Sequence, residues 1–365
     1  MRKMLVRETA LVLTAAVLAA GTLASCRTDV PDDDIPYSPY LRIEKRNGIY
    51  VGGEYKHGVY VAYGIYGDRI PEDGKIVIPD GVELDETWCE VYDESNKWLR
   101  TLEVSDVKSI SIPAGTGSMT FPSITYLAGW PNSGEADIDI IYQGSLVDWC
   151  ENGYLNYSLH RAKSIQVDGG QTDPRMLERI TAEDIAGAKR IGGGAFSECE
   201  KLTSVEIPDS VTEIEGRAFA WCSNLKEIAI PDSVKEIGDS AFSGCSQLKE
   251  IAIPDSVTKI GDFAFISCTG LTSVTIGKGV TKIGVQMFED CRSLTSVEIP
   301  GSVTEIKLWA FSGCESLESV TFAKTDGWYW VNSDGNKVSV DFSDPKNNAS
   351  ILKEEHPTNY ARKTD

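Results

Sequence analysis

The sequence predicts a mainly β solenoid with short helical turns and a cap at each end. The first observation is a phenylalanine followed three positions later by a cysteine, six times at an interval of 23 residues. The phenylalanines are Phe196, Phe219, Phe242, Phe265, Phe288 and Phe311, and the cysteines are Cys199, Cys222, Cys245, Cys268, Cys291 and Cys314. The second observation is that columns of leucine, isoleucine and valine keep the same register. Because one such unit cannot bury its own apolar face, neighbouring units must stack into a continuous core.

Each unit divides into a strand, a turn and a returning segment. The strand has the pattern L-x-x-V/I-x-I, in which the apolar residues face inward. The sequence P-D-S-V follows at Pro208, Pro231 and Pro254. It predicts a turn, because proline fixes φ and the Asp and Ser side chains hydrogen-bond to nearby backbone. The stretch I-G-x-x-A-F-x-x-C then returns the chain to the next strand, and we expect a short helical turn within it.

This repeat resembles the BspA-like leucine-rich repeats of bacterial surface proteins, which read much like L-x-S-V-x-I-P-D-S-V-T-x-I-G-x-x-A-F-x-x-C. The resemblance covers residues 191–322 and implies a right-handed leucine-rich-repeat solenoid of regular 23-residue coils. Gly327-Trp328-Tyr329, followed by Asp341-Phe342, resembles the C-terminal cap of that family. Residues 323–365 are therefore assigned to a C-terminal cap.

The repeat is weaker in the N-terminal half. The sequences I-V-I-P at residues 76–79 and I-S-I-P at residues 110–113 repeat the strand and the start of the turn. Residues 70–190 are therefore interpreted as degenerate leucine-rich-repeat coils with insertions. Residues 37–69 are rich in tyrosine and valine and form either an N-terminal cap or an extra β element. The sequence does not separate these two interpretations.

Residues 1–25 have the features of a bacterial lipoprotein signal peptide. Arg2, Lys3 and Arg7 precede an apolar run over residues 10–23, and L-A-S-C at residues 23–26 matches a lipobox. The resemblance implies that Cys26 carries the lipid; an ordinary secretory signal with an incidental cysteine is the alternative. Residues 26–36 are an acidic tether that cannot bury apolar surface. We therefore expect a lipid anchor in the bacterial outer membrane, with surface exposure favoured over the periplasmic face.

The charge balance limits the classes of partner. The chain has 365 residues, with 55 acidic and 35 basic side chains and a formal net charge of −20. No basic cluster occurs beyond the signal peptide, so the protein should repel nucleic acid and anionic lipid surfaces. Contact with a membrane is expected through the lipid anchor only.

The cysteines form a regular pattern of their own. Nine cysteines in an exported chain ordinarily suggest disulfides. Six of them share one repeated position, where cysteine behaves as a small hydrophobe, so we expect a column of buried thiols. Disulfides between successive coils are the alternative. Cys89 and Cys150 lie outside the column and are candidates for a pair.

The sequence gives no indication of catalytic chemistry. His57, His160 and His356 are each isolated from any nucleophile motif, and no G-x-S-x-G, H-E-x-x-H or Walker-type loop occurs. No C-x-x-C spacing or histidine cluster suggests a metal. We therefore expect a protein that is not an enzyme and that needs neither a cofactor nor a metal.

Five apolar residues stand where other repeats carry glycine or polar residues, and they form the candidate partner-binding site: Trp221, Phe263, Val285, Leu308 and Trp309. An exposed apolar patch of this kind marks either a partner site or packing against a cap. Both interpretations are open, because Trp328 and Trp330 of the expected cap follow shortly after Trp309.

The resemblance implies a lipid-anchored cell-surface protein that mediates protein binding or adhesion. Its partners would be host matrix or serum proteins, or other bacteria. An envelope glycan-binding accessory protein that uses exposed aromatics such as Trp221 and Trp309 is the alternative from a different class.

Overall fold

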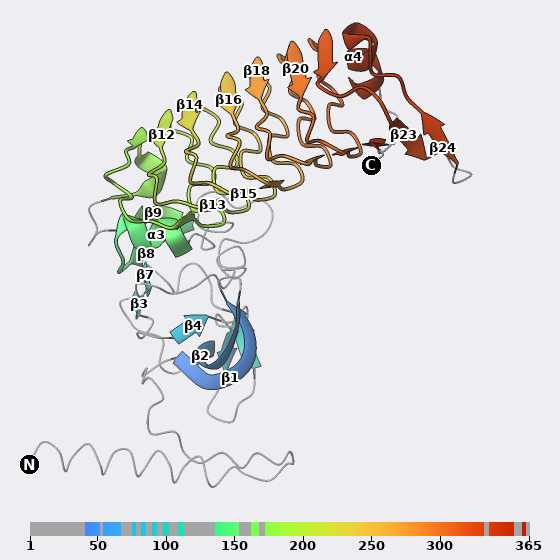
Figure 1. The fold of residues 1–365 in the computed structure, drawn as a ribbon. Helices are drawn as coiled ribbons and strands as arrows, with labels where there is room; N and C mark the ends of the chain where they lie inside the picture. Colours follow the sequence, from blue (N-terminus) through green and yellow to red (C-terminus); the bar gives the residue numbers. More distant parts are fainter. Residues whose placement is uncertain are drawn as a thin grey trace, which may run out of the picture.

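Stacked parallel strands form the body of the protein (Figure 1). The computed structural model describes residues 41–51, 54–66, 75–77, 82–84, 90–92, 98–101, 109–112, 136–152, 162–167, 172–331, 336–353 and 360–362. The predicted signal peptide, the lipidated Cys26, the acidic tether and Cys89 lie outside these residues.

Two rows of short strands run along the stack. The first row holds β10 (Arg179–Ile180), β12 (Ser204–Glu206), β14 (Glu227–Ala229), β16 (Glu250–Ala252), β18 (Ser273–Thr275), β20 (Ser296–Ile299) and β22 (Ser319–Phe322). The second row holds β11 (Arg190–Ile191), β13 (Glu213–Ile214), β15 (Glu236–Ile237), β17 (Lys259–Ile260), β19 (Lys282–Ile283) and β21 (Glu305–Ile306). Figure 1 shows the first row along the upper edge of the arc, with β13 and β15 below it. The chain is a mainly β solenoid, as the repeat predicts.

The strand register follows the sequence period. Val205 pairs with Ile228 in the first row, and Ile214 pairs with Ile237 in the second, so each residue meets the equivalent residue of the next coil. Parallel pairing of equivalent residues keeps every apolar column continuous along the stack. The inward-facing strand positions are accordingly buried, and Val205 is 3 % exposed.

The returning segment differs in detail from the short helical turn predicted for it. Ala195 N–H donates to Gly192 O within the coil (3.1 Å), whereas its neighbour Phe196 N–H donates to Ala218 O of the next coil (2.9 Å). Two residues of each segment have a left-handed backbone, as Gly194 does with φ +66°. A left-handed residue interrupts helical hydrogen bonding, so the segment is a series of turns and residues 191–322 contain no helix.

The phenylalanines make a continuous stack inside the coils. All six repeat phenylalanines are 0 % exposed. Neighbouring rings are close to parallel, with centroids 5.7 Å apart for Phe196 and Phe219 and 5.3 Å apart for Phe242 and Phe265. Each inner ring therefore contacts the rings of the coils before and after it, and each end ring contacts one, which couples the six coils to one another.

The repeated cysteines are free thiols that lie beside this stack, as predicted. Each thiol donates to a backbone carbonyl of the preceding coil: Cys222 Sγ lies 3.0 Å from Phe196 O, and Cys245 Sγ lies 3.2 Å from Phe219 O. Burial raises the pKa of the Cys268 thiol to about 12. Cys150, the candidate partner of Cys89, is also a buried free thiol. The thiols therefore act as hydrogen-bond donors that join successive coils.

Parallel strands also occur in the N-terminal half. They are β3 (Lys75–Val77), β7 (Ser109–Ile112), β8 (Ala136–Tyr142) and β9 (Ala162–Gln166). Ile110 pairs with Ile76 on one side and with Ile140 on the other, which are positions of the degenerate repeat. The helix α3 (Leu146–Asn152) follows β8, and Trp149 Nε1 donates to Ala195 O at 2.7 Å. A short 3-10 helix, η4 (Pro174–Met176), precedes β10.

Residues 41–66 form a separate antiparallel pair. The strand β1 (Leu41–Val51) pairs with β2 (Glu54–Tyr66), and β2 also pairs with β4 (Val82–Leu84) and β5 (Glu90–Tyr92). The strand β6 (Trp98–Thr101) completes this five-stranded sheet by pairing with β5. These strands belong to a sheet other than the one that contains β3, β7, β8 and β9.

The C-terminal segment covers the last coil. The helix α4 (Pro345–Lys353) packs on β22, and β25 (Tyr360–Arg362) pairs with β21 and with β23 (Trp328–Val331). The strand β24 (Lys337–Ser339) pairs with β23 to form a hairpin. Asn348 of α4 is 0 % exposed, and its Nδ2 donates to Val320 O at 2.8 Å and to Phe342 O at 2.9 Å. The segment thus satisfies backbone groups at the end of the stack, which is the role of a cap.

Candidate functional site

The returning segments of successive coils form one surface, here called the turn face. Its defining feature is two columns of residues with a left-handed backbone. The first column contains Gly194, Arg217, Ser240, Phe263, Gln286 and Trp309; the second contains Glu198, Trp221, Gly244, Ser267, Asp290 and Gly313. These columns explain why glycine and small polar residues recur there, because glycine adopts a positive φ without steric cost.

Three aromatic residues occupy these left-handed positions. They have φ values of 63° for Trp221, 61° for Phe263 and 55° for Trp309. Trp221 is 54 % exposed and Trp309 is 37 % exposed, whereas Phe263 is half-buried. None of the three belongs to the buried core. These three positions therefore carry large aromatic side chains outside the core, although glycine would adopt the positive φ at the lowest steric cost.

Four of the five predicted site residues come together. Phe263 N–H donates to Val285 O at 2.8 Å, and Gln286 N–H donates to Leu308 O of the next coil at 3.0 Å. Val285 and Leu308 are half-buried and lie outside the core. Hydrogen bonds between coils therefore place the backbones of these four residues next to one another on three successive coils; Phe263, Val285, Leu308 and Trp309 are here called the apolar patch.

Trp221 lies apart from the apolar patch. It belongs to the second left-handed column, on a coil separated from that of Phe263 by one intervening coil. Its indole covers Gly244 of the next coil, where a Cβ atom would stand 2.6 Å from Trp221 Cε3. Gly244 also has φ +73°, so both its backbone and its neighbour favour glycine. The indole is thus positioned by the next coil while more than half of its surface stays exposed.

The ring contacts of the cap do not include Trp309. Trp328 lies 5.3 Å from Phe322 and 5.6 Å from Phe342, measured between ring centroids. Trp330 packs against the buried core. In the part of the chain that the structure describes, no aromatic pair joins Trp309 to the cap. The cap aromatics therefore pack on one another and on the core.

The exposed side of the first strand row is less suited to tight binding. Its side chains are small or charged, and threonines that immediately precede the strands donate to the backbone: Thr272 Oγ1 to Lys249 O at 3.0 Å, and Thr203 Oγ1 to Glu178 O at 2.8 Å. Hot spots of protein recognition are enriched in Trp, Tyr and Arg. The turn face carries such residues, including Arg217 beside the aromatics in the first column.

Carboxylates near the apolar patch have structural partners. Asp239 Oδ1 accepts the Asp262 N–H at 2.9 Å, and Asp262 Oδ1 accepts the Val285 N–H at 2.8 Å. On the second strand row, the ammonium groups of Lys307 and Lys282 lower the pKa of the Glu305 carboxyl. Within the described residues, no cluster of three or more potential ligands can hold a metal ion. These charges therefore join coils and do not form a metal site.

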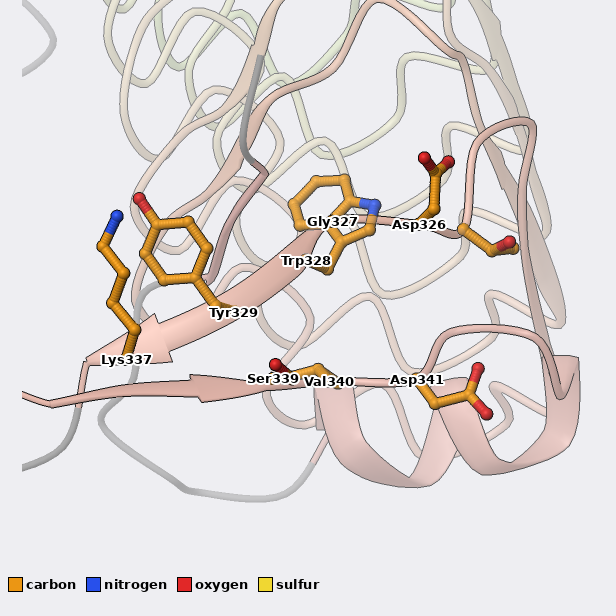
Figure 2. A pocket seen from close by; sticks show the side chains of 9 residues that line it. Asp326, Gly327, Trp328, Tyr329, Lys337, Ser339, Val340 and Asp341 are labelled. Atoms are coloured by element: carbon orange, nitrogen blue, oxygen red, sulfur yellow. The ribbon is translucent and has the colours of Figure 1, made fainter. Parts of the chain in front are cut away.

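Sequence reasoning missed a pocket in the C-terminal cap, here called the cap pocket. Residues 325–329 line it together with Lys337, Ser339, Val340 and Asp341, and its volume is about 540 Å³. Figure 2 shows that these residues come from the two strands of the β23–β24 hairpin and from the residues just before β23 and just after β24. Pairing of β23 with β24 brings residues 325–329 close to residues 337–341, and no local sequence pattern predicts that pairing.

Residues 189–318 match the family model of the BspA type leucine rich repeat region, in six copies. The chain contains a BspA-type leucine-rich-repeat region. The match spans the regular coils, the phenylalanine stack, the cysteine column and the turn face. Repeat arrays of this kind present extended surfaces, which suits the binding of proteins. No curated protein matches the sequence.

Three solved structures of bacterial proteins are similar to this chain. A leucine-rich repeat protein of T. pallidum is 22 % identical, with 71 % of this chain and 82 % of that chain covered, at a TM-score of 0.32. A leucine rich cell surface protein of Faecalibacterium prausnitzii is 19 % identical, with 81 % and 97 % covered, at 0.28. The pneumococcal vaccine antigen PcpA is 14 % identical, with 79 % and 95 % covered, at 0.42. Among the described residues, no helix has the length and apolarity needed to cross a membrane.

Proposed function

We propose that this protein is a lipid-anchored cell-surface protein that binds protein partners through the turn face of its BspA-type repeats. The proposal is supported by the repeat family, by the lipobox that ends at Cys26, and by the aromatic residues of the turn face. The partners would be host matrix or serum proteins, or surface proteins of other bacteria. The repeats are a scaffold in this proposal, and no catalytic step is assigned to them.

The observation that carries the proposal is the placement of Trp221, Phe263 and Trp309 in left-handed backbone. A left-handed conformation costs a residue with a side chain about 1 to 2 kcal/mol. The coil geometry imposes this conformation in every repeat, for example on Arg217 and Asp290, and none of the three aromatic side chains enters the core. Strained residues of this kind cluster at binding sites, where the surrounding fold holds them in place. A partner that covers the three aromatics would supply the missing burial.

Replacing the exposed aromatics should abolish partner capture without unfolding the protein. We expect a Phe263→Ala/Trp309→Ala variant to lose at least about tenfold in affinity, because aromatic hot spots contribute about 2 kcal/mol or more. The measurement is solid-phase binding to immobilised host matrix and serum proteins, with affinities determined for each saturable partner.

Met176→Ala is the matched control for this loss. Met176 is 53 % exposed but lies in η4, in the coil before that of Phe196 and four coils before that of Phe263, so its removal should leave binding unchanged. If no protein of the panel binds saturably, or if the double variant binds as tightly as the wild type, the turn face is not the partner site.

The location of the anchor is tested on intact cells of the native host. We expect external protease to remove the repeat region while a periplasmic control protein stays intact. A Cys26→Ala variant should lose incorporation of labelled fatty acid and leave the membrane fraction, because the lipidated cysteine is its proposed membrane contact. Protection of the repeats until the outer membrane is broken would place the protein in the periplasm and contradict the adhesin role.

A further inference from the structure

The cap pocket has a chemistry that differs from that of the turn face. Its volume of about 540 Å³ lies within the range of small-molecule sites. Trp328 is 2 % exposed and forms a fixed part of the wall, with its Nε1 donating to Lys324 O at 3.0 Å. Figure 2 shows Tyr329 and Lys337 at one end of the pocket and the carboxylates of Asp326 and Asp341 at the other.

Strand pairing explains how these groups share one face. Tyr329 of β23 pairs with Ser339 of β24. Lys337 and Ser339 are two positions apart in β24, so they point to the same side of the hairpin, and Asp341 follows the strand and lines the pocket at its other end. The ammonium of Lys337 lies 4.1 Å from the centroid of the Tyr329 ring. The pocket thus combines an aromatic ring, an ammonium donor, a hydroxyl and two carboxylate acceptors.

One of the carboxylates is held in its ionised form. Asp341 Oδ1 accepts the Ser343 N–H at 2.9 Å, and hydrogen bonds from the Ser343 side chain and backbone lower the pKa of the Asp341 carboxyl. The carboxylate is fully exposed to solvent and stays available to a ligand. An oriented, charged acceptor at one end of a pocket with an aromatic ring at the other end is suited to a ligand that donates several hydrogen bonds.

The charges select among ligand classes. A phosphate or nucleotide would meet the carboxylates of Asp326 and Asp341 and be repelled. A purely apolar ligand would displace water from both carboxylates and from the Lys337 ammonium without offering them hydrogen bonds in return. A neutral sugar fits, because its hydroxyls donate to carboxylates and accept from an ammonium, while its C–H face packs against a ring.

We propose that the cap pocket binds a neutral saccharide. Tyr329 packs against the sugar ring, Asp326 and Asp341 accept hydrogen bonds from its hydroxyls, and Lys337 donates to an oxygen at the other end. This site is separate from the turn face and independent of its protein partners. A protein with both sites would recognise a protein through its coils and a glycan through its cap.

The test uses the full chain and a panel of free neutral disaccharides: maltose, cellobiose, lactose and chitobiose. Saturation-transfer NMR identifies a bound sugar, and a titration gives its Kd. We expect Tyr329→Ala and Asp341→Asn each to weaken binding about tenfold or more, because each removes a direct contact. Asp341→Asn keeps an acceptor for Ser343 and removes the negative charge, so the thermal unfolding midpoint should not change.

Two controls separate this proposal from general surface effects and from the turn face. Asp232→Asn removes an exposed carboxylate in a solenoid turn and should leave sugar binding unchanged. Trp309→Ala should also leave it unchanged. If no disaccharide binds, if both pocket variants bind like the wild type, or if Trp309→Ala abolishes the signal, the cap pocket is not a saccharide site. None of these results decides whether the turn face binds proteins.

Discussion

Replacing Phe265 by alanine should destabilise the protein by about 3 to 5 kcal/mol, the usual cost of emptying a core position of this size. Phe265 is 0 % exposed and stacks on Phe242 at 5.3 Å and on Phe288 at 5.5 Å. Its loss removes both contacts at once, in the middle of the stack. Because each coil contacts only its neighbours, the coils before and after position 265 should then unfold in separate steps.

Urea unfolding followed by circular dichroism measures this effect. The matched control is Phe263→Ala, the same chemical change two residues earlier, at a half-buried position outside the core. We expect it to change the free energy of unfolding by less than about 1 kcal/mol. Equal losses in the two variants would show that the phenylalanine stack does not hold the coils together.

Asn348→Asp should cost about 3 kcal/mol or more at neutral pH. The wild-type amide donates to two carbonyls, Val320 O and Phe342 O, at a position with 0 % exposure. A carboxylate there removes both donors and brings a buried negative charge against carbonyl oxygens. Burial would raise the pKa of the new carboxyl above its unfolded value, so the loss should shrink as the pH falls through that raised pKa.

Asn347→Asp is the control, because it makes the same charge change at the adjacent, exposed position of α4. Asp in the first turn of a helix is favourable, so this variant should lose no stability. Thermal unfolding of both variants across a pH series provides the measurement. A similar loss in both, or a loss in Asn348→Asp that does not depend on pH, would contradict the proposed role of the Asn348 amide.

The regular coils could be predicted from the sequence because their period is strict. A 23-residue repeat forces equivalent residues into columns, and an invariant Phe and Cys in each repeat must then face the same interior. The structure buries Phe219 and Cys222 side by side with their equivalents, as expected. The aromatic candidate residues stand out for a related reason, since Phe263 and Trp309 depart from the pattern of their column.

Other features depend on contacts that no local pattern encodes. The alternating left-handed residues of the returning segment follow from hydrogen bonds that alternate between one coil and the next. The thiol bond from Cys222 to Phe196 O joins residues 26 positions apart. The pairing of β25 with β21 joins Tyr360 to Ile306 across the whole cap segment. The sequence marks Trp328, Tyr329 and Asp341 as residues of the cap, but the pocket between them depends on the register of the hairpin, which the sequence does not show.

If the chain is exported as proposed, the cysteine column has a consequence for how it reaches its native state. A thiol such as Cys245 is sheltered only after its coil has docked on the preceding one, because its hydrogen-bond acceptor belongs to that coil. Before docking, an oxidant can reach the sulfur, and an oxidised sulfur can no longer donate to the carbonyl. During folding, the docking of each coil therefore competes with the oxidation of its thiol. A thiol that is free in the folded protein therefore belongs to a coil that docked before its sulfur was oxidised.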